Sequence, residues 1–286
     1  MAMPRAEIIG PQHLGAGEAG QVDLNAYRWR LLAEGDSWFS LGSIPPHNLL
    51  MGLEFDTAVV VLNLAYPGDE VRKMFRRLWD YGAEFANWMT MRSTWRWDAI
   101  LLSGGGNDLI AAFAHLLRAG VDPAQADPSR PQDLVDPAAL ALLDRYLIDS
   151  YRGFVECRDR PGSPNAGVPM IVHTYDYPTP NNAPALAFGI RISGPWIYPL
   201  LNGRLPQEVW QPLTDYLLDH VAETLLALPA QLPNFHVVDT RGTLVRAEPG
   251  VAGASNDWEN EIHASADGYR KVARRVAAEV ARRIGT

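Results

Sequence analysis

The chain carries a serine and a histidine that are far apart in the sequence but follow the same kind of segment. Ser37 lies in a Gly-Asp-Ser turn directly after the apolar run Trp29–Ala33, and His263 lies just before the last amphipathic segment. A serine hydroxyl is a weak nucleophile until a neighbouring base takes its proton. An imidazole can be that base because it titrates near neutral pH. The pair therefore predicts nucleophilic chemistry if the fold brings the two side chains together.

Two further polar motifs also stand at the ends of apolar runs. Gly68 follows the run Ala58–Leu64, and Asn107 follows the run Ala99–Leu102. The backbone N–H groups of Ser37 and Gly68, with the side-chain N–H of Asn107, could form an oxyanion hole of three donors. Taken singly, each motif is explained equally well as a turn or a helix cap. Their occurrence together, each after a predicted strand, favours one catalytic site.

The residue that orients His263 is left open by the sequence. Asn260 lies three residues before the histidine, and Asp257 lies six residues before it. An asparagine oxygen can accept the imidazole N–H, but it cannot stabilise the imidazolium by charge. Because serine triads usually use a charged third member, we favour Asp257, with Asn260 as the alternative.

The segments that must position these residues alternate between short apolar runs and amphipathic helices. Strands are expected in five runs: Trp29–Ala33, Ala58–Leu64, Ala99–Leu102, Val168–Thr174 and Phe235–Asp239. Helices are expected at Pro137–Arg158, at Gln207–Leu228 and in the C-terminal segment that carries Val272, Val276, Val280 and Ile284. This alternation predicts a doubly wound α/β fold with a parallel sheet. In such folds the active site gathers at the carboxyl ends of the strands.

No change in composition marks a linker, so we expect one domain over residues 1–286. Two segments do not fit the strand–helix repeat, at about 120–137 and 177–206. The second is rich in proline and carries Trp196 and Tyr198. Such long loops often cover or line a binding site, so we expect Trp196 and Tyr198 to bind substrate; the alternative is a surface excursion without function.

Charge and composition exclude several classes of protein. A net charge of −8 argues against a nucleic-acid partner. The seven histidines show no metal-binding spacing and the single cysteine cannot form an internal disulfide, so no metal or cofactor is expected. No apolar stretch approaches the ~20 residues of a transmembrane helix, and no signal peptide is visible at the N-terminus. We therefore expect a cytoplasmic protein of undetermined oligomeric state, although a leader removed beforehand would leave the same sequence.

The four motifs, in this order, resemble those of the SGNH hydrolase superfamily, which includes the GDSL-like esterases and lipases. The family's blocks correspond to Gly35-Asp36-Ser37, to Gly68, to Gly105-Gly106-Asn107-Asp108 and to the region around His263. The resemblance implies a flavodoxin-like three-layer α/β/α sandwich with a five-stranded parallel sheet. It also implies Ser37 as nucleophile, Gly68 and Asn107 as oxyanion donors and His263 as base. The chain departs from the family at Asn260, where an aspartate is usual.

The expected function is that of a serine esterase that hydrolyses a carboxylic ester through an acyl-enzyme. The same residues could serve an acyltransferase, in which an alcohol replaces water as the acceptor. A catalytically inactive binding module is the third alternative, and only Asn260 supports it. The ester's acyl length and alcohol depend on loop shapes that the sequence does not specify.

Overall fold

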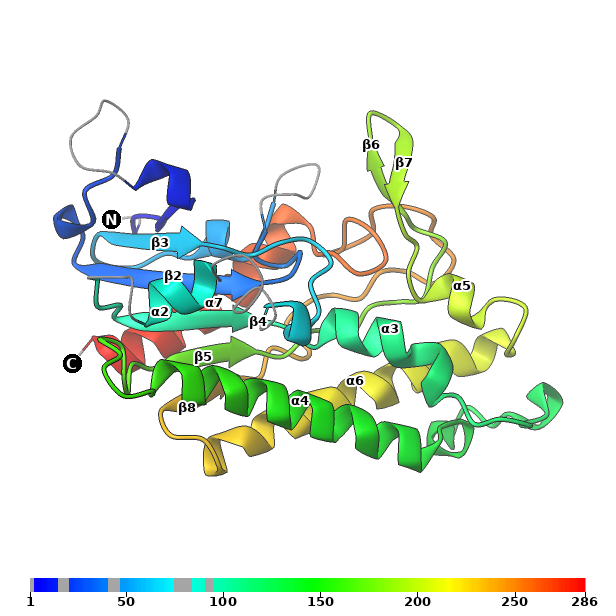
Figure 1. Cartoon of the computed structure of the whole chain (residues 1–286). Helices are drawn as coiled ribbons and strands as arrows, with labels where there is room; N and C mark the ends of the chain where they lie inside the picture. Colours follow the sequence, from blue (N-terminus) through cyan, green and yellow to red (C-terminus); the bar gives the residue numbers. More distant parts are fainter. Residues whose placement is uncertain (1–2, 15–20, 41–46, 75–83, 91–94, 286) are drawn as a thin grey trace.

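The structure, a computed structural model, describes residues 3–14, 21–40, 47–74, 84–90 and 95–285. At its centre is a six-stranded sheet in which every pair of neighbouring strands is parallel (Figure 1). In sheet order the strands are β1 (Glu7–Ile9), β3 (Val59–Asn63), β2 (Trp29–Gly35), β4 (Ala99–Ser103), β5 (Met170–His173) and β8 (Phe235–Val238). The inner strands are almost wholly buried, which explains why each reads as a continuous apolar run.

The five expected strands are all present, with ends shifted by one or two residues, but the expected number of strands is wrong. β1 pairs with β3 at the edge of the sheet and makes a sixth strand. It has only three residues, and Glu7 within it is exposed, so the sequence contains no long apolar run from which this strand could be predicted. Along the centre of the sheet, β2 and β4 pair so that Gly35 stands opposite Ser103.

Helices lie on both faces of the sheet, as the expected three-layer arrangement requires (Figure 1). The described helices are α2 (Glu84–Met89), α3 (Gly106–Leu116), α4 (Pro137–Arg158), α5 (Tyr198–Leu201), α6 (Trp210–Ala227) and α7 (Ala266–Ile284), of which α5 lies beyond the carboxyl ends of the strands. α4 begins after Asp136, whose carboxylate accepts two backbone N–H groups at the helix start. α7 packs its stripe of valines inward, as its sequence periodicity predicts. No helix in the described part of the chain is long and apolar enough to cross a bilayer.

The segment 177–206 folds into a hairpin followed by a short helix. β6 (Ala185–Ala187) pairs antiparallel with β7 (Ile190–Ser193), and the hairpin projects from the body of the molecule (Figure 1). Its apolar side chains are exposed, and that of Phe188 is 100% exposed. The segment 120–137 instead contains two short 3-10 turns that lead into α4.

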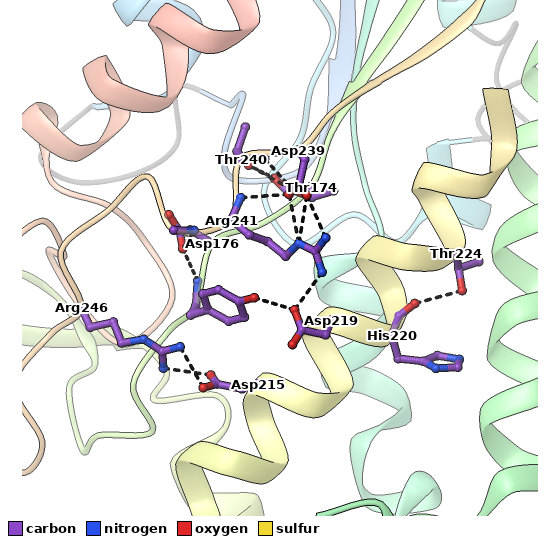
Figure 2. A network of polar contacts seen from close by, with 12 residues as sticks. Thr174, Asp176, Asp215, Asp219, His220, Thr224, Asp239, Thr240, Arg241 and Arg246 are labelled. Carbon is purple, nitrogen blue, oxygen red and sulfur yellow. Dashed lines mark hydrogen bonds and ion pairs between the residues drawn. The ribbon is translucent and has the colours of Figure 1, made fainter.

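A network of ion pairs and hydrogen bonds fastens the loops after β5 and β8 to α6 (Figure 2). Arg241 binds Asp219 at 2.8 Å, and Arg246 binds both oxygens of Asp215 at 2.9 and 2.8 Å. The hydroxyl of Tyr177 donates to the same Asp219 at 2.5 Å. Because Asp215 and Asp219 are one turn apart, these contacts hold that turn of α6 beside the carboxyl end of the sheet.

Candidate active site

The structure brings the predicted serine and histidine into direct contact. Ser37 Oγ lies 2.8 Å from His263 Nε2, although 226 residues separate them in the sequence. Ser37 stands in the turn after β2, where the Asp36 carboxylate accepts the N–H of Trp38 at 3.0 Å. His263 lies in the loop between β8 and α7. Both positions follow strands at the carboxyl edge of the sheet, where parallel α/β folds place their sites.

The imidazole of His263 is held in its neutral form. Burial lowers the pKa of its imidazole to about 4, because an apolar surrounding disfavours the charged form. Its Nδ1 lies 2.9 Å from Asn260 Oδ1, and the same oxygen accepts the backbone N–H groups of Ile262 and His263 at 3.2 and 3.0 Å. These backbone donors orient the Asn260 oxygen toward the ring, so Nδ1 carries the hydrogen and Nε2 is free to accept one.

Asp257, the residue we favoured for orienting His263, makes other contacts. Its carboxylate binds Lys271 Nζ at 2.7 and 2.5 Å and accepts the N–H of Val245 at 2.7 Å. It therefore ties the loop before His263 to α7 and to the loop after β8. The structure corrects the expectation: the residue at Nδ1 is the neutral Asn260.

The two predicted oxyanion donors lie beside Ser37 and His263. Gly68 and Asn107 line one cavity of about 250 Å³ together with these two residues. Gly68 adopts a φ of +77°, which favours glycine, and nothing lies within 4 Å of where a Cβ would stand. Asn107 Nδ2 donates to the backbone oxygen of Asp69 at 3.1 Å. That bond fixes the amide and leaves its second N–H for a ligand.

Of the two aromatic residues expected to bind substrate, only Trp196 reaches the site. Its indole meets the His263 ring edge-to-face, with centroids 5.1 Å apart, and it lines the same cavity. Tyr198 instead packs edge-to-face on Trp210 of α6 at 5.6 Å, and it lines neither of the two cavities that Ser37 borders. Tyr198 is the first residue of α5, and its ring therefore lies outside the two cavities beside Ser37.

Glu261, to which the sequence had suggested no role, holds Trp196 in place. Its buried carboxylate accepts the backbone N–H groups of Trp196, Ile197 and Tyr198, the last two at 2.8 and 2.6 Å. Burial raises the pKa of Glu261 to about 7, although these N–H groups oppose the shift. The only sequence signal for this role was its position between Asn260 and His263.

A buried polar network lies under the Ser37 turn. The carboxylate of Asp36 accepts the hydroxyls of Ser103 and Tyr175 at 2.9 and 2.5 Å, and His173 Nε2 lies 3.0 Å from Ser103 Oγ. Burial raises the pKa of Asp36 to about 6 and lowers that of His173 to about 4. Within the described residues, no group of three or more His, Cys, Asp or Glu side chains is placed to hold a metal ion.

A second, narrower cavity of about 40 Å³ also borders the serine. It shares Ser37, Asn107 and Ile262 with the larger one. Most of its remaining wall is apolar and includes Leu109, Ile110, Phe113, Ile197, Leu218 and Trp258. Ser37 thus stands where a wide cavity and a narrow apolar one meet.

Comparison with known proteins identifies the fold. No protein-family model matches the sequence, and no curated protein does. A lipase from a goat rumen metagenome aligns in structure with a TM-score of 0.52 at 14% identity, over 87% of this chain and 96% of that one. The chain has the fold of this lipase. The expected α/β/α fold around a parallel sheet is thereby confirmed, with six strands in place of five.

The same comparison finds a catalytic mutant of Axe2, an acetylxylan esterase from Geobacillus stearothermophilus. It aligns with a TM-score of 0.43 at 15% identity, over 88% of this chain and 94% of that one. At identities this low, no activity carries over from these proteins to this chain.

Proposed function

We propose that the chain is a carboxylic ester hydrolase that acts through Ser37 and an acyl-enzyme. The observation that carries the proposal is the 2.8 Å contact between Ser37 Oγ and His263 Nε2, with Nδ1 of the same ring held by Asn260. A nucleophile in contact with a base that a third group orients is the arrangement that serine hydrolases use. The fold shared with a lipase agrees with this function.

In the first half of the reaction Ser37 Oγ attacks the ester carbonyl carbon while its proton passes to His263 Nε2. The carbonyl oxygen becomes an oxyanion that accepts hydrogen bonds from the Ser37 and Gly68 N–H groups and from the Asn107 amide. Collapse of this intermediate breaks the bond to the alcohol, which takes the proton from His263 as it leaves. The products of this half are the free alcohol and the acyl-Ser37 ester.

In the second half water takes the place of the alcohol. His263 accepts a proton from the water, the resulting hydroxide attacks the acyl carbon, and the Ser37 oxygen leaves with the proton that the ring returns. The acid is released and the serine is restored. Asn260 keeps the ring oriented throughout, but it adds no negative charge beside the imidazolium that forms in each half.

Labelling with a fluorophosphonate tests the proposal directly, because only an activated serine reacts. We expect stoichiometric labelling of the wild-type protein at Ser37, hydrolysis of p-nitrophenyl butyrate, and loss of both in Ser37→Ala with an unchanged unfolding temperature. Absence of labelling in the folded wild-type protein would identify an inactive binding module. If added alcohols divert most of the acyl group into new esters, the activity is acyl transfer.

A further inference from the structure

The narrow cavity beside Ser37 extends along α3. Leu109 and Phe113 line it from that helix, and Asn107, near the start of α3, stands at its junction with the wide cavity. Because a helix rises 1.5 Å per residue, its wall reaches about 9 Å from Asn107 to Phe113. A group bonded to the Ser37 oxygen, with its carbonyl on Asn107, has this wall within reach of its chain.

The size of the cavity limits that chain. Its volume is about 40 Å³, on a scale where one water molecule needs about 10–15 Å³. It therefore accommodates about three to four groups the size of a water or a methylene. The cavity of about 250 Å³ on the other route from Ser37 is the one with room for a larger substituent.

Two buried polar atoms of residues that line the narrow cavity have no partner among the described residues: the hydroxyl of Thr214 and the indole N–H of Trp258. Thr214 is 1% exposed and lines the cavity, yet its hydroxyl forms no hydrogen bond with any described residue. A helical threonine can bond the carbonyl four residues back, and this one does not. By contrast, the Asp176 carboxylate in the same wall accepts the N–H groups of Tyr177, Gly242 and Leu244. A buried hydroxyl left unpaired costs stability, so its retention points to a ligand.

The position of that hydroxyl is set before any ligand binds. Asp215 and Asp219, the residues after Thr214 and Leu218 on α6, are the ones that bind arginines of the loop after β8 (Figure 2). These ion pairs hold the charged side of the helix, while Thr214 and Leu218 line the cavity. The cavity therefore offers a preformed, largely apolar slot with the unpaired Thr214 hydroxyl in its wall.

We infer that this slot binds the acyl group of the ester, and that the preferred acyl group is a short chain with an oxo or hydroxy substituent that bonds Thr214. The inference rests on the proposed function, because it is the acyl-Ser37 ester that places the chain there. The chain has about three to four carbons beyond the reacting carbonyl, and the alcohol part of the ester occupies the wide cavity.

Pairs of substrates that differ only in the substituent test the inference. We compare kcat/KM for p-nitrophenyl pentanoate and 4-oxopentanoate, and for butyrate and 3-hydroxybutyrate, with nonanoate as the long chain. The wild-type protein should favour an oxo or hydroxy ester over its plain partner at least tenfold, the usual cost of an unpaired buried hydroxyl. Nonanoate should be the poorest substrate.

Three variants separate the hydroxyl from the shape of the slot. Thr214→Val keeps the shape and removes the hydroxyl, so the preference for the substituted ester should disappear and the plain ester should improve. Thr214→Ser keeps the hydroxyl and should keep the preference. Thr224→Val is the matched control on the same helix, because the Thr224 hydroxyl bonds Asp144 and the His220 backbone oxygen and does not line the slot.

The outcomes distinguish this inference from the function on which it rests. Equal rates for each pair in a protein that is labelled at Ser37, or a preference that survives in Thr214→Val, would overturn the inference alone. If no ester is hydrolysed, calorimetry with Ser37→Ala still decides the slot. Ser37→Ala should bind 4-oxopentanoate more tightly than pentanoate, and the double variant Ser37→Ala/Thr214→Val should bind the two equally. Equal binding of the two acids by Ser37→Ala itself would overturn the inference.

Discussion

Asn260 Oδ1 lies 2.9 Å from His263 Nδ1, the position at which serine triads usually carry a carboxylate. The amide oxygen orients the ring as a carboxylate would, but it does not favour the charged imidazolium. Together with burial, this explains why the pKa of His263 stays well below that of an ordinary histidine.

Removal of Asn260 should therefore cost more activity than removal of Asp257. Asn260→Ala leaves Nδ1 without its acceptor, and we expect kcat to fall by about 10²-fold or more. Asp257→Ala should keep kcat within about threefold while it lowers the free energy of unfolding by about 1–2 kcal/mol, because Lys271 and the Val245 N–H lose their partner. Steady-state kinetics and urea unfolding of both variants measure the two effects. A larger loss of kcat in Asp257→Ala than in Asn260→Ala would instead show that Asp257 takes part in catalysis.

The pH dependence of kcat/KM should show its acidic limb near pH 4. The ring must be neutral to accept the serine proton, and burial lowers the pKa of His263 to about 4, so activity is lost as pH falls through that value. In Asn260→Asp the added charge should raise this pKa and move the limb toward neutral pH. A limb at the ordinary histidine value of about 6.5 in the wild-type protein would show that the base is not buried as described.

Glu261 should make the folded protein less stable as pH rises from 6 to 7. The folded state keeps the Glu261 proton up to a pKa of about 7, whereas an unfolded glutamate releases it near its ordinary value of 4.5. At Glu261 the folded state therefore binds more protons in this window, which lowers the free energy of unfolding by up to about 1.4 kcal/mol per pH unit. The buried His263 and His173 act in the opposite direction, because their pKa of about 4 leaves them neutral in the folded state while the unfolded state protonates them below about pH 6.5. The effect of Glu261 is therefore the difference in slope between the wild-type protein and a variant without this carboxylate. Asp36 and Asp108, whose pKa burial raises to about 6, affect the free energy of unfolding chiefly below pH 6. Urea unfolding at closely spaced pH values measures the slope.

The free energy of unfolding should change more positively with pH between 6 and 7 in Glu261→Gln than in the wild-type protein, by up to about 1.4 kcal/mol per pH unit. Glu223→Gln, which alters an exposed carboxylate on α6, should keep the wild-type slope. The glutamine variant should also show altered KM, because the same carboxylate holds the backbone of Trp196 beside His263. An unchanged slope would mean that Glu261 ionises in the folded state as it does in the unfolded one.

Asn107→Ala should lower kcat by roughly 10²–10³ and change KM much less, since an oxyanion donor acts mainly on charge that develops in the transition state. Stopped-flow measurement of acylation with p-nitrophenyl butyrate isolates the affected step. A rise in KM with constant kcat would instead make Asn107 a ground-state binding residue.

Most of the fold could be predicted from the sequence, because the central strands and the long helices depend on local patterns of apolar residues. Apolar runs locate the inner strands, and the motifs at their ends meet because parallel strands end at one edge. The short edge strand β1 carries too weak a pattern to be seen. Asp257 was favoured on charge alone, but its partner Lys271 comes from α7, which no local pattern connects to it. Glu261 and Thr214 owe their roles to segments tens of residues away, and the sequence around them does not encode those contacts.

Gly35 and Ser103 face one another on β2 and β4, the strands that lead to Ser37 and Asn107. A Cβ added at Gly35 would stand 2.7 Å from Ser103 Cβ and 2.8 Å from its backbone oxygen, so even alanine would push these strands apart. The close packing of β2 on β4 thus sets the spacing of the two segments that carry Ser37 and Asn107, whereas the walls of both cavities come largely from helices and loops. Substitutions in the hairpin, in α6 and in α3 beyond Asn107 can therefore change substrate preference without altering the spacing that β2 and β4 set.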